Sequence, residues 1–175
     1  MNNIIKNLEN IFSINEIEKK RGDLYFITAE KEQLISVITH LRDIAGFTSL
    51  VFLQCLDRIE NEIFQLTYML HNYNINISLG VRIKLNRTEP EMFSIHHLWE
   101  HAETFQRELK ELFGIDFPGS PGIDDGFVLE GWDNIPPMRR DFDTVKYNEE
   151  TFFPRPGRES KDPAQYMKEK LYPEE

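Results

Sequence analysis

The chain has 175 residues, of which 40% are hydrophobic, and it carries a formal net charge of −10 at pH 7. This length and apolar content suffice for one domain with a hydrophobic core plus an appended segment, and they exclude a chain that is disordered throughout. The negative charge and the absence of any lysine- and arginine-rich cluster argue against binding to nucleic acid or to anionic lipid headgroups.

The cysteine content and the apolar runs limit the chemistry and the location of the protein. Cys55 is the only cysteine, which excludes an intrachain disulfide and any cysteine-based zinc or iron–sulfur site. Its apolar sequence neighbours favour a buried, unreactive thiol. No apolar stretch reaches the about 20 residues that a membrane helix requires, and residues 1–6 lack the features of a signal peptide. We therefore expect a cytoplasmic protein without direct membrane insertion.

The first part of the chain predicts a helix, a hairpin and a second helix. Apolar residues recur at helical spacing from Ile4 to Phe12. Residues 13–28 read as two strands joined by a turn at residues 20–23, although the first strand is weakly marked. Residues 31–43 carry a second amphipathic stripe, and Gly46 follows its end.

Three strands and a third helix are predicted next. Residues 50–56 form a nearly continuous apolar run, residues 63–70 follow after a polar turn, and residues 75–85 alternate between apolar and polar types. Such alternation is typical of a strand with one buried face. A helix over residues 94–113 then closes a domain at residues 1–113. This order predicts an α+β fold, a mixed sheet of about five strands with helices on one face.

Residues 114–175 differ in composition from this domain. They contain eight of the nine prolines and six of the nine glycines, yet they are also rich in aromatic residues, which flexible linkers lack. The aromatic residues are Phe117, Phe127, Trp132, Phe142, Tyr147, Phe152, Phe153, Tyr166 and Tyr172. These rings must be buried against the chain's own domain or against a partner. Their number favours a long irregular C-terminal arm that wraps a partner subunit.

His97, Glu100 and His101 form the pattern H-x-x-E-H, which occurs in zinc peptidases. On a helix the two histidines would share a face, but Glu100 would project from the opposite side. Acids that could complete the site lie in the irregular segment, a poor support for a preorganised site: Glu149, Glu150 and Glu159. Histidines that pack or hydrogen-bond on a helix flank are the favoured interpretation. A small zinc hydrolase is the alternative from another functional class.

No other grouping indicates an independent catalytic site. The acids at residues 30–32 and 57–62 show no pairing that singles out a general acid and a general base. Pro118 and Pro121 remove N–H donors that a phosphate-binding loop at residues 117–122 would need. We expect no catalytic residue, cofactor or metal in this chain.

The third predicted helix and the residues after it carry a more specific pattern. Residues 105–122 read FQRELKELFGIDFPGSPG, and residues 131–142 start with GW and end with PPMRRDF. The pattern resembles the signature of the thirty-kilodalton-subunit family of respiratory complex I and of the corresponding subunits of membrane-bound, energy-converting nickel–iron hydrogenases. In that family the helix typically contains Glu-Arg-Glu, where this chain has Gln106-Arg107-Glu108, followed by an acid, where it has Glu111.

The resemblance is specific over residues 99–142 and departs from the family pattern at two places. Gln106 replaces the first glutamate, and Ser120 with the acidic residues 122–127 stands where complex I subunits typically carry a histidine and a basic pair. These departures favour the hydrogenase branch or a related sulfur-reducing complex. A free-standing chain of 175 residues suits an archaeal assembly, as an expectation from the resemblance. A complex I subunit with a quinone acceptor is the alternative.

The resemblance implies a non-catalytic structural subunit in the hydrophilic arm of a membrane-bound, ion-translocating oxidoreductase complex. The chain would dock on the large catalytic, hydrogenase-like subunit beside iron–sulfur subunits, and these partners would hold the iron–sulfur clusters and a nickel–iron centre. It would be cytoplasmic and peripheral to the cell membrane through the complex. Aromatic and arginine residues dominate binding at such interfaces. The predicted interface residues are Arg107, Glu108, Glu111, Phe113, Trp132, Arg139, Arg140, Asp141 and Phe142.

Overall fold

A computed structural model of the chain describes residues 1–129 and 131–152, which belong to two compact units, Met1–Arg139 and Arg140–Glu175. The elements of the first unit are α1 (Asn2–Ile11), β1 (Ile14–Lys19), β2 (Leu24–Ala29), η1 (Lys31–Gln33), α2 (Leu34–Asp43), β3 (Ser49–Arg58), η2 (Ile59–Asn61), β4 (Ile63–Asn72), β5 (Ile77–Asn86) and α3 (Ala102–Phe113). The second unit contains α4 (Thr144–Phe152). Within the described ranges, no helix combines the length and apolar content that crossing a membrane would require.

The first unit is built on one five-stranded sheet with the order β1-β2-β5-β4-β3. The pairs β1–β2, β3–β4 and β4–β5 are antiparallel, whereas β2 and β5 run parallel. A parallel pair needs a long connection, which α2, β3 and β4 provide here. The predicted α+β fold with a mixed sheet is therefore confirmed.

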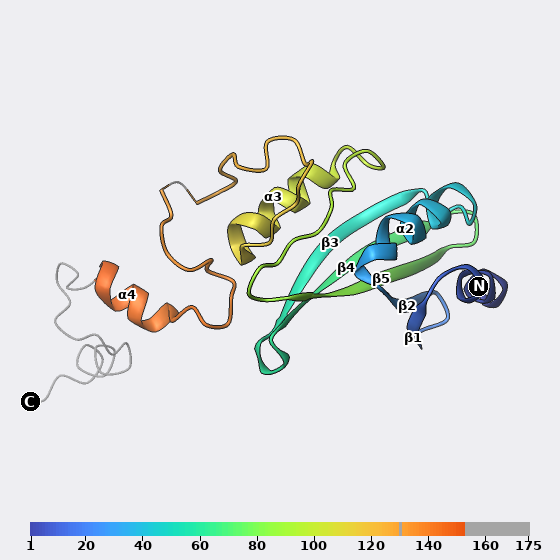
Figure 1. The fold of residues 1–175 in the computed structure, drawn as a ribbon, viewed down its shortest axis with the longest axis horizontal. Coiled ribbons are helices and arrows are strands. Elements are labelled where there is room, and N and C mark those ends of the chain that lie inside the picture. Colours follow the sequence, from blue (N-terminus) through green and yellow to red (C-terminus); the bar gives the residue numbers. More distant parts are fainter. Residues whose placement is uncertain (130, 153–175) are drawn as a thin grey trace, which may run out of the picture. The chain divides into compact units, whose positions relative to one another are not determined.

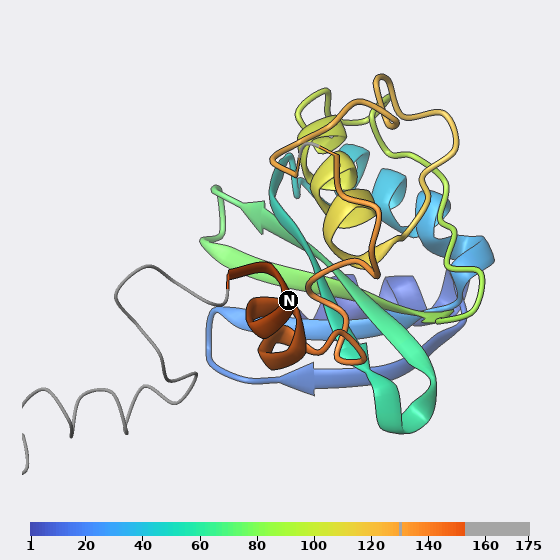
Figure 2. The same ribbon diagram turned by 90° about the vertical axis from the view of Figure 1, so that its left-hand side faces the viewer.

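The helices cover one face of this sheet and enclose the hydrophobic core. In α2 the apolar stripe of Leu34, Val37, Ile38 and Leu41 is completely buried. The alternating residues of β5 point into the same core, as the sequence predicts. Figures 1 and 2 show α2 and α3 on the same side of the sheet in both views. The burial of apolar side chains between these two layers is the main stabilising contribution to the unit.

The opposite face of the sheet carries the side chains at the alternate strand positions. Eight of them line one shallow hollow: Phe26, Phe52, Gln54, Leu56, Gln65, Thr67, Met69 and Arg82. We call these eight residues the open sheet face. The burial pattern of β3, in which Gln54 and Leu56 are exposed while Leu53 and Cys55 are buried, reflects this division between two faces.

The third helix is shorter than its sequence pattern suggests. It begins at Ala102, so the prediction of a helix over residues 94–113 is wrong for its first two turns. Residues 95–101 form turns instead, because side chains from this stretch reach the backbone before and in β3. Trp99 Nε1 donates a hydrogen bond to the Thr48 carbonyl at 2.8 Å, and His101 Nε2 lies 3.0 Å from the Leu50 carbonyl oxygen.

The compact unit extends beyond the predicted boundary at residue 113, to Arg139. Ile115 and Phe117 are completely buried in the core, and the Met92 N–H donates to the Asp116 carbonyl at 2.9 Å. The chain after α3 therefore returns along residues 91–94 before it leaves the core, and the expectation that its aromatic rings lie on a partner is wrong for Phe117. The wrapping of a partner by the later residues stays a prediction. Phe153, Glu159, Tyr166 and Tyr172 lie outside the described residues.

Candidate partner interface

Helix α3 presents two different faces, one to the sheet and one to the chain that follows it. Ala102, Gln106, Leu109 and Phe113 are buried on the sheet side at helical spacing. Gln106, which stands where the family has glutamate, is completely buried, and its Oε1 accepts a 2.9 Å hydrogen bond from Ser94 Oγ. The other face of α3 carries Arg107, Lys110 and Glu111, which organise the segment after the helix.

Gly114 turns the chain back at the end of α3. Its φ of +76° is a left-handed conformation that favours glycine, and its N–H bonds to the Lys110 carbonyl at 2.8 Å. A side chain at this position would also crowd Pro136, whose Cγ lies 3.2 Å from the position of a Cβ. The tight turn allows residues 115–139 to return along the helix that precedes them.

The Glu111 carboxylate holds three consecutive backbone N–H groups of this returning segment. Phe127, Val128 and Leu129 donate to it at 2.6, 2.8 and 3.0 Å. Burial raises the pKa of Glu111, but these N–H groups and the Arg107 guanidinium outweigh it and hold the pKa below its ordinary value. Glu111 therefore acts as an internal anchor, and its oxygens are occupied by the chain itself.

Lys110 and Arg107 provide two further attachments on the same helix face. Lys110 Nζ lies 2.8 Å from Asp116 Oδ1 and 2.6 Å from Asp124 Oδ1. Burial lowers the pKa of Lys110, but the two carboxylates raise it to a value above the ordinary one. The Arg107 guanidinium stands 5.8 Å from the centre of the Phe127 ring. Charged side chains therefore fix the path of residues 115–129.

A groove of about 310 Å³ separates α3 from the returning segment. Arg107, Lys110, Glu111, Ile123, Asp124, Leu129, Trp132, Asn134 and Pro136 line it. Trp132 is half-buried on its rim, and its Nε1 donates to the Ile135 carbonyl at 3.1 Å. The groove thus combines an arginine, a tryptophan and apolar side chains on a fixed backbone.

The predicted interface residues of the first unit fall into two groups. Arg107, Glu111 and Trp132 are brought together in this groove, and Glu108 lies on the same helix, half-buried. Phe113, by contrast, is only 8% exposed and packs edge-on against Phe64 at 6.0 Å. Its ring belongs to the core of this chain, so the prediction that it contacts a partner is not supported by its position.

Arg139 closes the first unit beside a buried ion pair that the sequence did not single out. Its guanidinium stands 5.5 Å from the centre of the Phe64 ring, and that of Arg87 stands 5.4 Å from the same ring. Arg87 Nη2 donates to Asp57 Oδ2 at 3.0 Å, and the Asp57 side chain is only 2% exposed. The available signal was an acid at an inward position of β3, which the alternation of that strand could have revealed.

Arg140, Asp141 and Phe142 belong to the second unit. Arg140 and Asp141 are exposed, and the Phe142 ring is half-buried, 5.5 Å from the ring of Tyr147. Asp143 Oδ1 accepts hydrogen bonds from the N–H groups of Val145 and Lys146, at 3.1 and 2.9 Å, and so caps the start of α4.

The H-x-x-E-H pattern does not form the helical pair that a zinc peptidase requires. His97 and His101 precede α3, so they do not share a helix face. His101 Nε2, at 3.0 Å from the Leu50 carbonyl oxygen, must carry a proton to make that hydrogen bond and is then unable to bind a metal. In residues 1–129 and 131–152, no group of three or more histidine, cysteine or acidic side chains is placed to hold a metal ion.

Comparison with known proteins gives a family match and several relatives. Residues 27–148 match the model of the family described as "Respiratory-chain NADH dehydrogenase, 30 Kd subunit". The chain is 30% identical to the C subunit of NADH-quinone oxidoreductase from Moorella thermoacetica, over 81% of this chain and 95% of that protein. It is 29% identical to the corresponding C/D subunit from a Hydrogenobaculum species, of which it spans 22%, and 31% identical to the C 1 subunit from Rhizobium etli, of which it spans 65%.

Two solved structures have a similar fold. One is a chain of the membrane-bound sulfane sulfur reductase, an archaeal respiratory membrane complex, with a TM-score of 0.79 and 19% identity over 86% of this chain and 90% of that chain. The other is the trypsin-resistant fragment (1–134) of Nqo5, with a TM-score of 0.58 and 21% identity over 69% of this chain and 96% of that fragment. At these identities the likeness establishes a common fold.

Proposed function

Because the chain belongs to the family of the respiratory-chain NADH dehydrogenase 30 Kd subunit, we propose that it is a non-catalytic structural subunit of a membrane-bound, ion-translocating oxidoreductase complex. The observation that carries the proposal is the family match over residues 27–148, which includes both most of the sheet and the segment organised by α3. Relatives of this chain are named as subunits of NADH-quinone oxidoreductase, and its fold recurs in a respiratory membrane complex. The subunit would lie in the hydrophilic arm, on the cytoplasmic side, held to the membrane through its partners.

The groove beside α3 is the proposed docking surface for the large catalytic subunit. Arginine and tryptophan are enriched among residues that dominate binding energies, and both line this groove on a backbone fixed by Glu111. The contact residues proposed at the groove are Arg107, Glu108 and Trp132. Arg139 in the first unit is proposed as a separate contact, and so are Arg140, Asp141 and Phe142 in the second unit, which is considered by itself. Glu111 and Phe113 would contribute indirectly, by shaping the segment and the core beneath it.

Electron transfer in the complex would take place in the partner subunits. We propose that they hold the iron–sulfur clusters and a nickel–iron centre, and that this chain holds none. Cys55 supports the proposal for this chain, because burial and the Asp57 charge raise the pKa of its thiol to about 12, which disfavours the thiolate that ligates metals.

Two electron acceptors are in question for the parent complex. The hydrogenase branch, or a related sulfur-reducing complex, is favoured by Ser120 and the acidic residues 122–127. A quinone-reducing complex is the second candidate, because the Moorella thermoacetica relative, 30% identical and covered over 95% of its length, is named for that acceptor. Metal analysis of the native complex tests the hydrogenase branch, which stoichiometric nickel would support. If a complex that retains iron lacks nickel, assays of polysulfide reduction and of quinone reduction separate the sulfur-reducing complex from the quinone-reducing one.

The docking proposal is tested by replacing Trp132 in the native host. Tagged chain with Trp132→Ala should recover at least about tenfold less large subunit than the wild type, because it removes an aromatic anchor from the groove. Tyr73→Ala is the matched control, since Tyr73 is 73% exposed at the far end of β4. Urea unfolding of the isolated chain should stay cooperative in both variants, so that the loss of the large subunit is not caused by unfolding. Normal recovery of the large subunit with Trp132→Ala would contradict the groove as the docking surface.

A further inference from the structure

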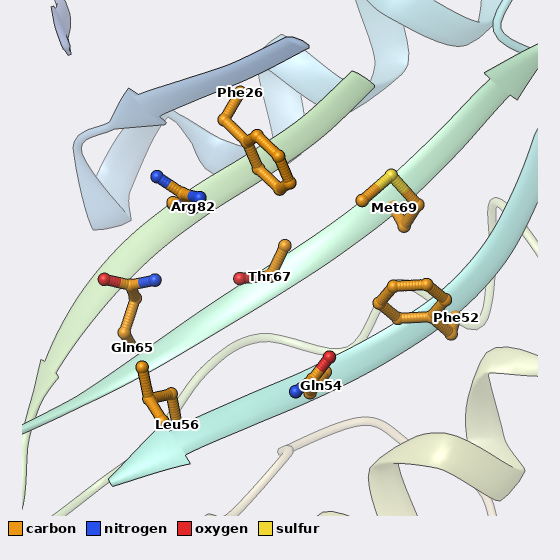
Figure 3. Close-up of a pocket in the computed structure, with 8 residues that line it drawn as sticks. All are labelled: Phe26, Phe52, Gln54, Leu56, Gln65, Thr67, Met69 and Arg82. Carbon is orange, nitrogen blue, oxygen red and sulfur yellow. The ribbon is translucent and has the colours of Figure 1, made fainter. Parts of the chain in front are cut away.

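The open sheet face carries an apolar patch that the helices leave uncovered. Figure 3 shows its side chains rising on one side of β3, β4 and β5, with Phe26 reaching across from β2. Half-buried Phe52 and exposed Leu56 form its accessible apolar part on β3, beside the buried Met69, around a hollow of about 240 Å³. Leu56 is 47% exposed, and so is Val51, where β3 has an irregularity in its pairing. Contiguous exposed apolar patches of this kind mark interaction sites on soluble proteins.

The Phe26 ring can lie over the sheet because Gly80 has no side chain. A Cβ at Gly80 would lie 2.4 Å from Phe26 Cδ1, so the Phe26 ring lies directly over the backbone of β5. The Arg82 guanidinium stacks on the same ring, 3.9 Å from its centre. The ring and the guanidinium are thereby held in place, which reduces the entropic cost of ordering these side chains when a partner binds.

Two cations on the β5 side of this face, Arg82 and Lys84, are paired within the chain, and Arg58 is an exposed cation at the end of β3. Arg82 Nη1 lies 3.0 Å from Glu18 Oε2, and Lys84 Nζ lies 3.7 Å from Glu16 Oε1. Both acids come from β1, at the far edge from the patch. The side chains of the open face on β3 and β4 are apolar or uncharged. A partner that covers the patch must therefore also be uncharged where it makes contact.

The two edges of the sheet differ in the same way. β1 carries Glu16, Glu18 and Lys19, and charged side chains are a common protection against strand pairing at an edge. β3 is the other edge, and it has no charged residue from Ser49 to Leu56. Trp99 and His101, which precede α3, hydrogen-bond to the Thr48 and Leu50 carbonyls, at the beginning of this edge. Residues 51–56 of β3 are thus an uncharged stretch of edge strand, which ends at Asp57 and the exposed Arg58. An uncharged edge beside apolar side chains suits an added strand.

We propose that an extended, apolar and uncharged segment of another subunit lies along β3 and covers the open sheet face, a proposal that rests on the function of the chain as a subunit of a complex. A second copy is disfavoured as the occupant, because each chain carries a net charge of −10 and two copies would repel one another. An extended segment fits because its backbone pairs with the edge strand, while its alternate side chains enter the hollow. This surface is distinct from the groove beside α3.

A lysine at position 56 tests the proposal in the native complex. Leu56→Lys places a charge in the uncharged patch and should reduce recovery of the complex by tagged chain at least about tenfold. Ile44→Lys is the matched control, because Ile44 is 73% exposed after α2, on the helix side of the sheet. Recovery should be normal with this variant. Equal recovery with both variants would overturn the proposal.

A crosslink identifies the occupant without relying on a charged substitution. A photoreactive amino acid at Gln54, which is exposed on β3, is irradiated in the purified native complex, and the crosslinked peptide is sequenced by mass spectrometry. The expected product joins β3 to an uncharged, apolar stretch of another subunit. A crosslink to a second copy, to residues 140–175 of the same chain, or to no protein would overturn the proposal.

The two proposals fail in different ways. If the wild-type chain recovers no subunits at all, its function as part of a complex is wrong. If the wild type recovers them but Leu56→Lys does so equally well, or the Gln54 crosslink gives one of the contrary products, only the assignment of the open sheet face is wrong.

Discussion

The sheet and the segment after α3 belong to one compact unit, but different interactions hold them. The sheet is stabilised by many completely buried apolar side chains contributed by five strands and by helices on one face. Residues 123–129 are attached to α3 mainly by polar and charged groups, above all by the Glu111 carboxylate and Lys110. The sheet thus depends on packing distributed over many side chains, whereas residues 123–129 depend on a few directional contacts.

This difference has consequences for how each region responds to mutation. Burial is additive over many residues, so the loss of one large side chain weakens the whole cooperative unit without detaching a particular part. Hydrogen bonds to one carboxylate are concentrated, so the loss of that carboxylate releases one stretch of chain and leaves the rest in place. The predictions below separate global from local effects.

The largest effect is expected for Leu66→Ala. Leu66 is completely buried in β4, and removing its side chain should lower the free energy of unfolding by about 2–5 kcal/mol, through lost burial and the cavity left behind. Urea unfolding of the isolated chain measures the change.

Leu56→Ala provides the control, because the same atoms are removed from a side chain that is 47% exposed on the neighbouring strand. The free energy of unfolding should change by no more than about 0.5 kcal/mol. If both variants lost the same stability, the assignment of the two faces of the sheet would be wrong.

The sheet was predictable because its information is local in the sequence. From Leu79 to Leu85 in β5, apolar residues alternate with Gly80 and with basic residues. This alternation alone identifies the strand and its buried face. The apolar stripe of α2 predicts its helix equally well, because residues three and four apart lie on the same face of a helix. Such a pattern arises in any strand or helix that buries one face, and it does not depend on which other elements cover that face.

The details around α3 were not predictable, because they depend on contacts between distant residues. The start of the helix is set by Trp99 and His101, which bind carbonyl groups about fifty residues earlier in the chain. The role of Glu111 depends on N–H groups of residues 127–129, and nothing in an i, i+4 pattern of charges distinguishes such an anchor from a solvated side chain. Phe117 was assigned to a partner for the same reason, since composition does not indicate which surface buries a ring.

A smaller, local effect is expected for Glu111→Ala. Hydrogen bonds to a charged acceptor are worth about 1–3 kcal/mol, so amide hydrogen exchange of Phe127, Val128 and Leu129 should accelerate by roughly 5- to 150-fold. Exchange in β4 and β5 should be unchanged.

Glu108→Ala is the matched control for this experiment, as it removes a half-buried glutamate from the same helix. It should leave exchange at residues 127–129 as in the wild type. Acceleration throughout the sheet in Glu111→Ala would contradict the local character of the anchor.

The smallest effect is expected from protonation of Glu111, which weakens the same contact without changing the sequence. Its pKa in the folded chain lies below the ordinary value of 4.5, so the stabilisation is fully present above 4.5 and is lost as the pH falls through the lower, folded value. The backbone amide resonances of Phe127, Val128 and Leu129 should therefore shift together, with one midpoint below 4.5, when NMR spectra are followed from neutral pH downwards. Glu111→Gln should abolish this common transition, whereas Glu108→Gln should retain it. A common midpoint at or above 4.5 would mean that burial of the carboxylate outweighs its three N–H donors, and the segment would then depend on Lys110 and Arg107 instead.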